Sequence, residues 1–520
     1  MAYIKKTKLD KTVLHEIKKD LTAITTFQTE YADGDNAKYS IYREKKSKLL
    51  VPRNYYYKNI VKLDDETNQN QDASSTSTDK MTNKMVKIKH KFDDGIPASF
   101  EFTKQLRDQQ LQIANECINK LQNSKNKNNC GIITLPCGFG KTVIGLYIAA
   151  QLKIKTLIIV HKTFLQDQWF DRIKEFTNAS IGIIRQKKTD TKDKDIVVGM
   201  LQSISMIKYD KSLFKDFGLV IYDEAHHVIS NVFSNALYKI KSKYCIGLTA
   251  TPNTGGNLSK VLHWHLGNVI YKIDTPAKNN DVVVKTINYS NSNDKLFVEK
   301  KLWFKGMFKP NVQKMINNIC MMASRNQLIA DLIYNLWINH DRKILVLSGR
   351  NSKVEHLRFI KEMIEDKIKQ NDLLQNECNI YYYTGKTSQL ERSEAEKHAD
   401  ILLATYEMAH EGLDIPRLNT IVLTTPKTSV KQAIGRIMRQ IHANNQPLIV
   451  DFVDELSVFP KQYDKRLKLY QNHNYVVKDV YVKNDKIISK KDYLMAKYKC
   501  SLDDLKDESD YEPSIAGIIS

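Results

Sequence analysis

Short apolar runs rich in β-branched residues alternate with amphipathic stretches over most of this chain, and this alternation limits the possible folds more than any other feature. The runs of the first series are residues 131–135, 155–160, 195–199, 218–224 and 244–250, and those of the second series are residues 343–348, 379–385, 400–406, 419–425 and 447–453. A run that is apolar on both faces is typical of a strand buried inside a parallel sheet, and the stretches between the runs are typical of helices that cover it. The sequence therefore predicts an α/β fold with two parallel-sheet domains in tandem.

Changes in composition divide the 520 residues into five parts. We expect a small N-terminal accessory domain over residues 1–100, a first α/β domain over 101–275, a linker over 276–320, a second α/β domain over 321–460 and a tail over 461–520. Residues 62–84 are polar and nearly free of large apolar side chains, which predicts a flexible loop. Arg53 and the tyrosines at 55–57 could add a DNA-binding surface, but a run of tyrosines favours a core position because each ring buries a large area.

Charge and cysteine content limit the class of protein. The chain has 80 Lys and Arg against 59 Asp and Glu, a net charge of +21 that is expected of a protein with a polyanionic partner, although a lysine-rich soluble surface is the alternative. Seven scattered cysteines without a C-x-x-C pair predict a reducing compartment with neither disulfides nor a zinc site. We find no signal peptide and no apolar run of membrane-spanning length, so we expect an intracellular protein without a membrane partner.

The motif LPCGFGKT at residues 135–142 lies between a predicted strand and a predicted helix. A strand, a glycine-containing turn and a helix start together aim backbone N–H groups at an anion. Lys141 would reach the β- and γ-phosphates of ATP, and the Thr142 hydroxyl would hold Mg²⁺. Leu135 stands where the strict phosphate-loop pattern has Gly, so an ordinary strand–helix turn is the alternative. The predicted ATP-binding residues of the loop are Pro136, Cys137, Gly138, Phe139, Gly140, Lys141 and Thr142.

Two adjacent carboxylates, Asp223 and Glu224, follow the apolar run at 218–222. Ligands of open parallel sheets bind at the carboxyl ends of the strands. Asp223 can hold a Mg²⁺ ion that bridges two phosphates, and Glu224 can orient and deprotonate the attacking water. An acidic helix cap after a strand is the alternative for these two residues taken alone.

Further motifs resolve both alternatives. They are LRDQQ at 106–110, DEAH at 223–226, GLTATP at 247–252, ATYEMAHEGLDIP at 404–416 and QAIGRIMR at 432–439. Together with the loop, they resemble the DEAH-box DNA helicases and translocases of superfamily 2. The closest resemblance is to the branch that contains XPB, the phage UvsW helicase and the helicases of poxviruses and other large DNA viruses. The resemblance implies two RecA-like domains, with ATP and Mg²⁺ as cofactors.

The resemblance also implies roles for individual residues. The implied nucleotide contacts outside the loop are Arg107, Gln110, His226, Gly412, Asp414 and Gln432. Arg436 and Arg439 would act as arginine fingers from the second domain. The implied nucleic-acid contacts are Lys162, Thr163, Gln202, Ser203, Arg350, Thr384, Gly385 and Thr405.

The expected function is that of an ATP-dependent DNA helicase or translocase in viral-type transcription, including transcript release, or in repair or replication. Its expected partners are duplex or single-stranded DNA and the transcription or replication machinery, with RNA as an alternative partner. A viral protein of this kind would be found in the virion or at a cytoplasmic replication site. The competing interpretations are a DEAH-type RNA helicase and a nucleic-acid-binding scaffold that does not hydrolyse ATP. The scaffold is disfavoured because every expected catalytic residue is present: Lys141, Thr142, Asp223, Glu224, Arg436 and Arg439.

Replacement of Arg436 or Arg439 by Ala should lower kcat by ~10³-fold or more, because an arginine finger stabilises charge that develops only during phosphoryl transfer. The affinity for ATP should change much less. Steady-state ATPase kinetics and nucleotide binding measured on the same variants separate the two effects. An equal loss of binding and turnover would instead identify a contact with the ground-state phosphate.

Overall fold

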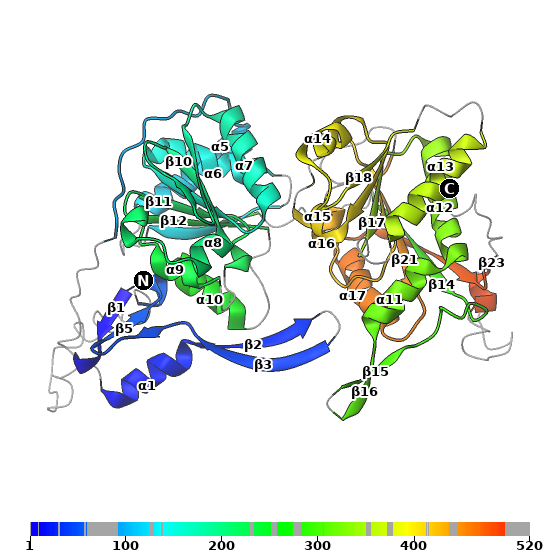
Figure 1. The fold of residues 1–520 in the computed structure, drawn as a ribbon, viewed down its shortest axis with the longest axis horizontal. Coiled ribbons are helices and arrows are strands. Elements are labelled where there is room, and N and C mark those ends of the chain that lie inside the picture. The colour runs from blue at the N-terminus through cyan, green and yellow to red at the C-terminus, as the bar shows by residue number, and fades with distance from the viewer. Residues whose placement is uncertain are drawn as a thin grey trace. The chain divides into compact units, whose positions relative to one another are not determined.

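The chain forms two compact units, Met1–Thr275 and Pro276–Ser520, in a computed structural model (Figure 1). The structure describes residues 2–8, 10–29, 32–56, 59, 92–123, 129–136, 139–228, 233–250, 257–273, 282–304, 306–349, 355–371, 378–411, 413, 415–435 and 445–493. The predicted loop at 62–84 lies outside these residues. In the part of the chain that the structure describes, no helix is both long and apolar enough to cross a membrane.

The first unit is built on an eight-stranded sheet with the order β13-β6-β12-β11-β7-β10-β8-β9. Its strands are β6 (Cys130–Thr134), β7 (Thr156–Val160), β8 (Ile181–Arg185), β9 (Lys188–Asp190), β10 (Ile196–Met200), β11 (Leu219–Tyr222), β12 (Tyr244–Thr249) and β13 (Val269–Lys272). All neighbouring pairs are parallel except β8 and β9. The five apolar runs of the first series are confirmed as strands of one parallel sheet.

Helices cover both faces of this sheet (Figure 1). They are α5 (Asp108–Gln122), α6 (Lys141–Leu152), α7 (Thr163–Phe176), α8 (Leu201–Met206), α9 (Asn235–Lys239) and α10 (Asn257–Leu266), with 3₁₀ turns at Lys211–Phe214 and Ala225–His227. Alternate strand residues belong to two separate apolar clusters: Leu157 and Val220 lie in one, and Ile158 and Ile221 lie in the other. The strands are therefore apolar on both faces because both faces are buried.

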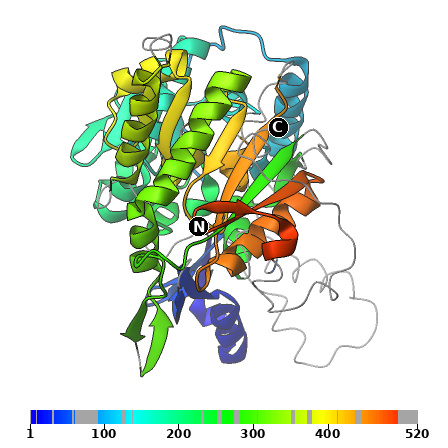
Figure 2. The same cartoon turned by 90° about the vertical axis from the view of Figure 1, so that its right-hand side faces the viewer.

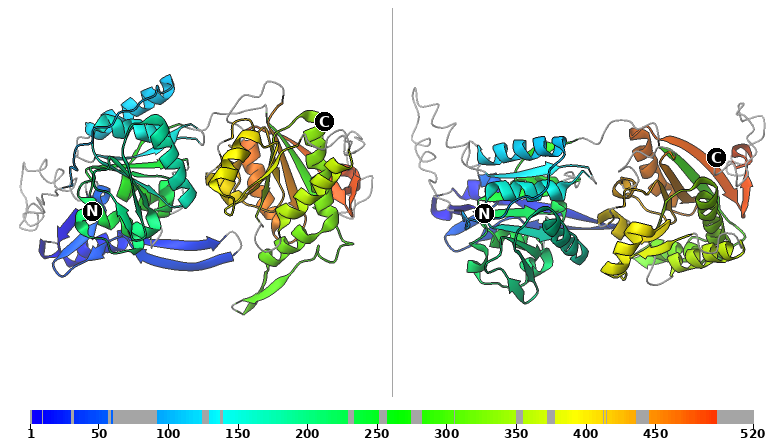
Figure 3. Two further views of the ribbon diagram at one scale, coloured as in Figure 1. Left: turned by 45° about the horizontal axis from the view of Figure 1, so that its top comes forward. Right: turned by 90° about the horizontal axis from the view of Figure 1, so that it is seen from above.

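The N-terminal segment packs against the first of these clusters. It comprises β1 (Ala2–Lys5), a 3₁₀ turn (Lys6–Lys8), α1 (Lys11–Asp20), β2 (Thr22–Thr29), β3 (Ala32–Ser40), β4 (Arg43–Glu44), β5 (Lys48–Val51) and α2 (Arg53–Tyr55). The β2–β3 ribbon extends away from the body of the first unit in both views of Figure 3.

Three of the residues proposed for a DNA-binding surface, Arg53, Tyr55 and Tyr56, are buried instead, and Tyr57 lies outside the described residues. Tyr55 and Tyr56 are 3% and 4% exposed, which confirms the core interpretation for these two tyrosines. The Arg53 guanidinium is also buried, and it donates to Cys130 Sγ at 2.9 Å and to the Lys243 carbonyl at 2.9 Å. The segment is thus an integral part of the first unit, and Arg53 holds it in place.

The second unit contains another eight-stranded sheet, with the order β18-β19-β17-β20-β21-β14-β22-β23. Its strands are β14 (Val283–Ser290), β17 (Ile344–Ser348), β18 (Ile380–Tyr383), β19 (Ile401–Thr405), β20 (Thr420–Leu423), β21 (Leu448–Asp454), β22 (Val476–Lys483) and β23 (Lys486–Ile488). The surrounding helices are α11 (Val312–Met321), α12 (Ala323–His340), α13 (His356–Lys369), α14 (Gln389–His398), α15 (Tyr406–Glu411), α16 (Lys431–Ile434) and α17 (Phe459–Asn472). Figure 2 shows α12 and α13, in yellow-green, in front of one face of the sheet.

The structure differs from the sequence-based expectation at both ends of this unit. Part of the expected linker, 276–320, is β14, and part of the expected tail, 461–520, is α17, β22 and β23. β14 lies between β21 and β22 and is parallel to both. These strands extend the sheet beyond the five predicted ones, which are confirmed.

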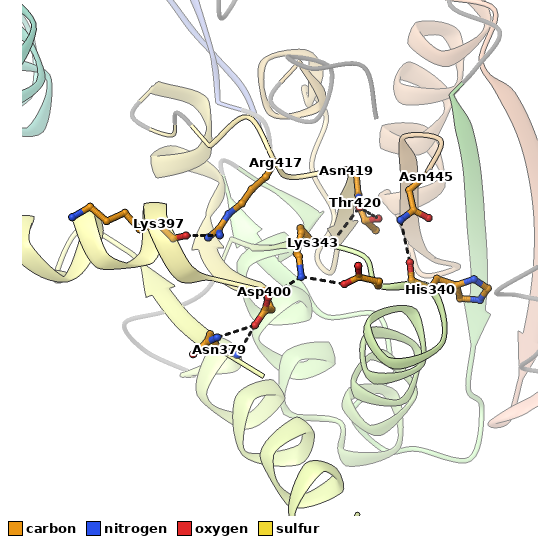
Figure 4. Close-up of polar contacts among 10 residues, drawn as sticks. His340, Lys343, Asn379, Lys397, Asp400, Arg417, Asn419, Thr420 and Asn445 are labelled. Atoms are coloured by element: carbon orange, nitrogen blue, oxygen red, sulfur yellow. Dashed lines mark hydrogen bonds and ion pairs between the residues drawn. The ribbon is translucent and has the colours of Figure 1, made fainter. Parts of the chain in front are cut away.

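Polar side chains close the amino edge of the second sheet (Figure 4). Asp400 precedes β19, and its carboxylate accepts from Lys343 Nζ at 3.0 Å and from the Asn379 backbone N–H at 2.8 Å. Asn419, which precedes β20, accepts from the Lys343 backbone N–H at 3.2 Å. The residues that precede four neighbouring strands are therefore tied to one another at this edge.

A buried ion pair joins α12 to β21. Arg325 and Asp454 are both 0% exposed. Arg325 Nε and Nη2 donate to the two Asp454 oxygens at 2.7 and 2.9 Å, and Nη2 also donates to the Thr424 carbonyl at 2.9 Å. Bidentate geometry and full burial make each partner dependent on the other.

Arg325→Met should destabilise the second unit by ~3–5 kcal/mol, because it leaves the Asp454 charge buried without a partner. The double variant Arg325→Met/Asp454→Leu should recover most of that loss. Urea unfolding followed by circular dichroism measures both. As a control, Arg358→Met removes an arginine that is 53% exposed in ion pairs, and should change stability by less than ~1 kcal/mol. If Arg325→Met left the free energy of unfolding nearly unchanged, the two residues would not depend on each other as this ion pair implies.

Candidate active site

The candidate residues of the first unit gather at the carboxyl edge of its sheet. The loop at 135–142 follows β6, the GLTATP motif overlaps the end of β12, the DEAH motif follows β11, Lys162 and Thr163 follow β7, and Gln202 and Ser203 follow β10. These five strands are neighbours in the order β6-β12-β11-β7-β10 and are all parallel. Residues far apart in sequence are thereby brought to one edge, where ligands of such sheets bind.

The described part of the loop is held in a conformation that requires glycine. Gly140 has φ +91°, and a Cβ at this position would lie 2.5 Å from Gln110 Nε2. Gln110 donates to the Phe139 carbonyl at 2.9 Å and accepts from the Arg107 N–H at 3.3 Å, so it ties the start of α5 to the loop. Lys141 Nζ donates to the Leu135 carbonyl at 3.2 Å, across the loop.

Leu135 has a structural explanation. Its side chain is 0% exposed and belongs to the apolar cluster that also contains Ile144 of α6. Its N–H donates to the Thr249 carbonyl at 3.2 Å, which continues the pairing of β6 with β12. The residue at this position therefore serves the core and precedes the turn.

Asp223 lies between a tryptophan and the backbone of the next residue. Its Oδ2 accepts from Trp169 Nε1 at 2.8 Å, and its Oδ1 accepts from the Glu224 N–H at 3.1 Å. Burial and the neighbouring Glu224 carboxylate raise the pKa of Asp223 to about 6, while the Trp169 hydrogen bond and the Lys141 charge act in the opposite direction. Two carboxylates held side by side in a buried position suit a divalent cation, which would remove their repulsion.

Glu224 has a left-handed backbone conformation, with φ 43° and ψ 57°. Such a conformation costs a non-glycine residue of order 1–3 kcal/mol and persists mainly where the surrounding structure imposes it. The Glu224 side chain is 13% exposed, and its Oε2 lies 3.4 Å from His226 Nδ1 without a hydrogen-bond partner. A buried carboxylate oxygen with spare acceptor capacity is able to bind and deprotonate a water molecule.

Three histidine rings form a continuous stack that begins beside the Glu224 carboxylate and leads away from it. The ring centroids of His226 and His227 are 4.2 Å apart, and those of His227 and His161 are 3.9 Å apart. His226 Nδ1 also lies 3.3 Å from Thr249 Oγ1, and the His161 carbonyl accepts from Gln202 Nε2. These contacts connect the ends of β11, β12, β7 and β10.

In the second unit, several candidate residues follow neighbouring parallel strands. Thr384 and Gly385 follow β18, and Thr405 ends β19. The Thr384 hydroxyl lies 3.2 Å from Thr387 Oγ1, and the Thr405 hydroxyl accepts from the Met408 N–H at 3.4 Å. Gln432 lies on α16. The structure thus brings Thr384, Gly385 and Thr405 to the carboxyl edge of the second sheet.

The roles predicted for these residues stay predictions. Seven of the predicted residues lie outside the described part of the chain: Cys137, Gly138, Arg350, Gly412, Asp414, Arg436 and Arg439. Two contributors to the site, Trp169 and His161, were not predicted, and Thr249 was predicted only as part of the GLTATP motif. A buried indole N–H needs an acceptor, which was the available sign that Trp169 has a polar partner.

Two family models match this chain. The model described as the res subunit of type III restriction enzymes matches residues 103–254, and the helicase conserved C-terminal domain matches residues 324–443. A protein of Acanthamoeba polyphaga mimivirus, named as an ATP-dependent RNA helicase (L396), is 32% identical over 483 residues, which cover 92% of this chain and 85% of the relative. The chain belongs to the superfamily 2 helicases.

A second relative supports this assignment. A protein of Invertebrate iridescent virus 6, named as a helicase (161L), is 28% identical over 420 residues, which cover 76% of this helicase and 87% of the relative. Both relatives come from large DNA viruses, so the predicted resemblance is confirmed. Among solved structures, a fragment of an HsdR subunit of a type I restriction enzyme from Vibrio vulnificus matches 75% of this helicase and 71% of that chain, with 16% identity and a TM-score of 0.51. That likeness supports the tandem RecA-like fold.

Trp169→Phe should raise the Mg²⁺ concentration that gives half-maximal ATPase activity by about 10-fold. The reason is that the helicase loses one hydrogen bond to the charged form of Asp223, worth ~1.5 kcal/mol or more. The same loss raises the pKa of Asp223, so the acidic limb of the pH–activity profile should move to higher pH, because a protonated carboxyl does not bind the cation.

The control for this variant is Trp337→Phe, which changes a tryptophan of α12 that is 8% exposed and belongs to the second unit. It should leave both the Mg²⁺ dependence and the pH profile unchanged. If Trp169→Phe lowers thermal stability but moves neither of them, the indole serves packing alone.

Proposed function

We propose that this helicase hydrolyses ATP at the carboxyl edge of its first sheet and uses the energy to move along or unwind DNA. One observation carries the proposal: a continuous series of contacts links the predicted catalytic carboxylate to the predicted nucleic-acid contacts. It runs from Glu224 through His226 and His227 to His161 and Gln202. A change at the γ-phosphate would therefore reach the strand-binding residues through side chains that already touch.

The described residues fit the binding of ATP with Mg²⁺. Lys141 is the first residue of α6. Its ammonium group, which donates to the Leu135 carbonyl, can instead donate to a phosphate oxygen when ATP is bound. The first turn of α6 adds backbone N–H groups for the phosphates. Asp223 and Thr142 would hold Mg²⁺, which would neutralise part of the phosphate charge.

Glu224 is the proposed general base. Its carboxylate would take a proton from the attacking water, and His226, 3.4 Å from Oε2, would help to fix its orientation. Gln432, Arg436 and Arg439 are assigned to the same reaction by the motif that contains them. Charge that develops on the transferred phosphoryl group would be stabilised by the two arginines.

DNA is the preferred substrate class because the motifs resemble those of DNA-acting members. The net charge of +21 suits the phosphate backbone of either nucleic acid. RNA is the second candidate, because the mimivirus relative is named as an RNA helicase. Transcription with transcript release, repair and replication are the processes that such an activity would serve. The backbone contacts proposed for Lys162, Thr163 and Gln202 would be nearly independent of base sequence.

The test is the ATPase activity of the full chain with duplex DNA, single-stranded DNA or single-stranded RNA added at matched phosphate concentration. Greater stimulation by either DNA than by RNA supports the proposal. Stimulation by RNA alone would select the RNA helicase, and absence of stimulation by all three would overturn the function. Salt must be kept constant, because phosphate contacts weaken steeply with ionic strength.

Glu224→Gln should keep ATP binding and lower turnover by at least ~10²-fold, since the amide accepts hydrogen bonds but takes no proton. Lys141→Ala should lose both binding and turnover. Lys153→Ala is the matched control, because Lys153 is an exposed residue that caps the other end of α6. Turnover by Glu224→Gln at the native rate would exclude Glu224 as the base.

A further inference from the structure

A two-stranded ribbon projects from the second unit (Figures 1 and 2). It consists of β15 (Lys301–Phe304) and β16 (Met307–Pro310), which pair only with each other among the described strands. Four of its large apolar side chains are exposed: Leu302 by 37%, Trp303 by 64%, Met307 by 55% and Phe308 by 69%. Exposed apolar residues in such a group mark a binding surface.

The aromatic pair near the tip has a defined geometry. Trp303 and Phe308 are directly opposite each other in the antiparallel register and therefore lie on the same face. Their centroids are 4.9 Å apart with an interplanar angle of 73°, so each ring fixes the orientation of the other. Gly306 at the turn has φ +81°, and no other atom would lie within 4 Å of a Cβ added to it. A planar partner can therefore approach the tip.

The base of the ribbon is fixed to the unit. The Asn311 N–H donates to the Lys300 carbonyl at 2.7 Å, and the Asn311 side chain accepts from the Lys314 N–H at 3.0 Å at the start of α11. On the other side, Glu299 Oε1 accepts from Ser457 Oγ at 2.7 Å. An isolated hairpin is only marginally stable, so these contacts are what hold the tip in a constant position.

The charges beside the aromatic pair identify the kind of partner. The described residues of 298–311 include three lysines, Lys300, Lys301 and Lys309, and one acid, Glu299, which lies 3.4 Å from Lys301 Nζ. The surplus is therefore positive. A partner that offers both flat π-faces and regularly spaced negative charges is a nucleic-acid strand with unpaired bases.

We propose that the β15–β16 ribbon binds unpaired bases of the nucleic-acid substrate by stacking on Trp303 and Phe308, with the neighbouring lysines close to the phosphates. This inference rests on the proposed function for the identity of the substrate. It adds a contact that lies outside all the helicase motifs. Stacking accepts every base, so the contact suits an enzyme that moves along a strand regardless of sequence.

Tryptophan fluorescence tests the contact directly in the full-length protein. Of the four tryptophans, Trp169 and Trp337 are 1% and 8% exposed, Trp264 is partly buried, and Trp303 is 64% exposed. Acrylamide quenching therefore reports mainly on Trp303. Oligothymidylate or oligouridylate of about 16 nucleotides, the upper site size of common single-strand binders, should protect the fluorescence, and the two oligomers separate DNA from RNA. Unchanged quenching at saturating oligomer would overturn the proposal.

Variants test the energetic contribution. Trp303→Ala and Phe308→Ala should each weaken binding of the oligomer about 10-fold, a typical effect for one lost base stack. Trp303→Phe should retain most of the affinity, because phenylalanine also stacks. Leu390→Ala is the matched control, since Leu390 is 76% exposed on α14 of the same unit. It should bind as the native protein does.

The outcomes separate this inference from the proposed function. If nucleic acid stimulates the ATPase of the native protein but Trp303→Ala binds normally, the ribbon inference fails and the function stands. If nucleic acid neither binds nor stimulates, the function fails, and the inference fails with it. A lower melting temperature or a changed oligomeric state in Trp303→Ala would show that the ring packs against protein, which also overturns the inference.

Discussion

The hydrogen-bonded register of the central strands in the first sheet decides where the candidate catalytic side chains of the first unit lie. Thr134 at the end of β6 pairs with Thr249 of β12, and Tyr222 at the end of β11 pairs with Gly247 and with Ile159. Because these strands are parallel, the chain leaves the sheet at one edge after each of them. A slip of one residue would turn every side chain of the shifted strand to the opposite face. Burial of both faces therefore fixes the site as well as the core.

The acidic pair at this edge is stable only because of its neighbours. Desolvation and mutual repulsion disfavour two charged carboxylates, as the raised pKa of Asp223 indicates. The Trp169 indole, the Glu224 N–H and the Lys141 charge each offset part of that cost. The left-handed backbone at Glu224 adds a further cost. These costs lower the stability of the folded protein at the place where a cation and a water molecule would bind, which is typical of a functional site.

The sequence predicted most of the two sheets, because strands that are apolar on both faces have few alternative explanations. It missed β8, β9 and β13 of the first sheet and β14, β22 and β23 of the second, since none of them was part of the regular alternation of strand and helix. The contact between Trp169 and Asp223 joins residues 54 positions apart, and no local pattern encodes it. The ribbon was missed for another reason. Apolar side chains on both of its faces are exposed, whereas interpretation of hydrophobic periodicity assumes that apolar residues are buried.

Two buried carboxylates on β21 attach helices to the second sheet. Asp451 and Asp454 are an odd number of residues apart, so they face opposite sides of the sheet. Arg466 of α17 donates to Asp451 at 2.8 and 2.9 Å, and Arg325 of α12 holds Asp454 and the Thr424 carbonyl. The helix that carries Arg325 follows α11, whose first turn is capped by the residue that closes the ribbon. Thr424 in turn follows β20, which pairs with β17, and β17 pairs with β19, the strand that ends at the candidate nucleic-acid contact Thr405. The ribbon and the carboxyl edge of the second sheet are thus linked through α11, α12 and the Thr424 carbonyl. A change at that edge therefore has a path of contacts and chain connections to the base of the ribbon.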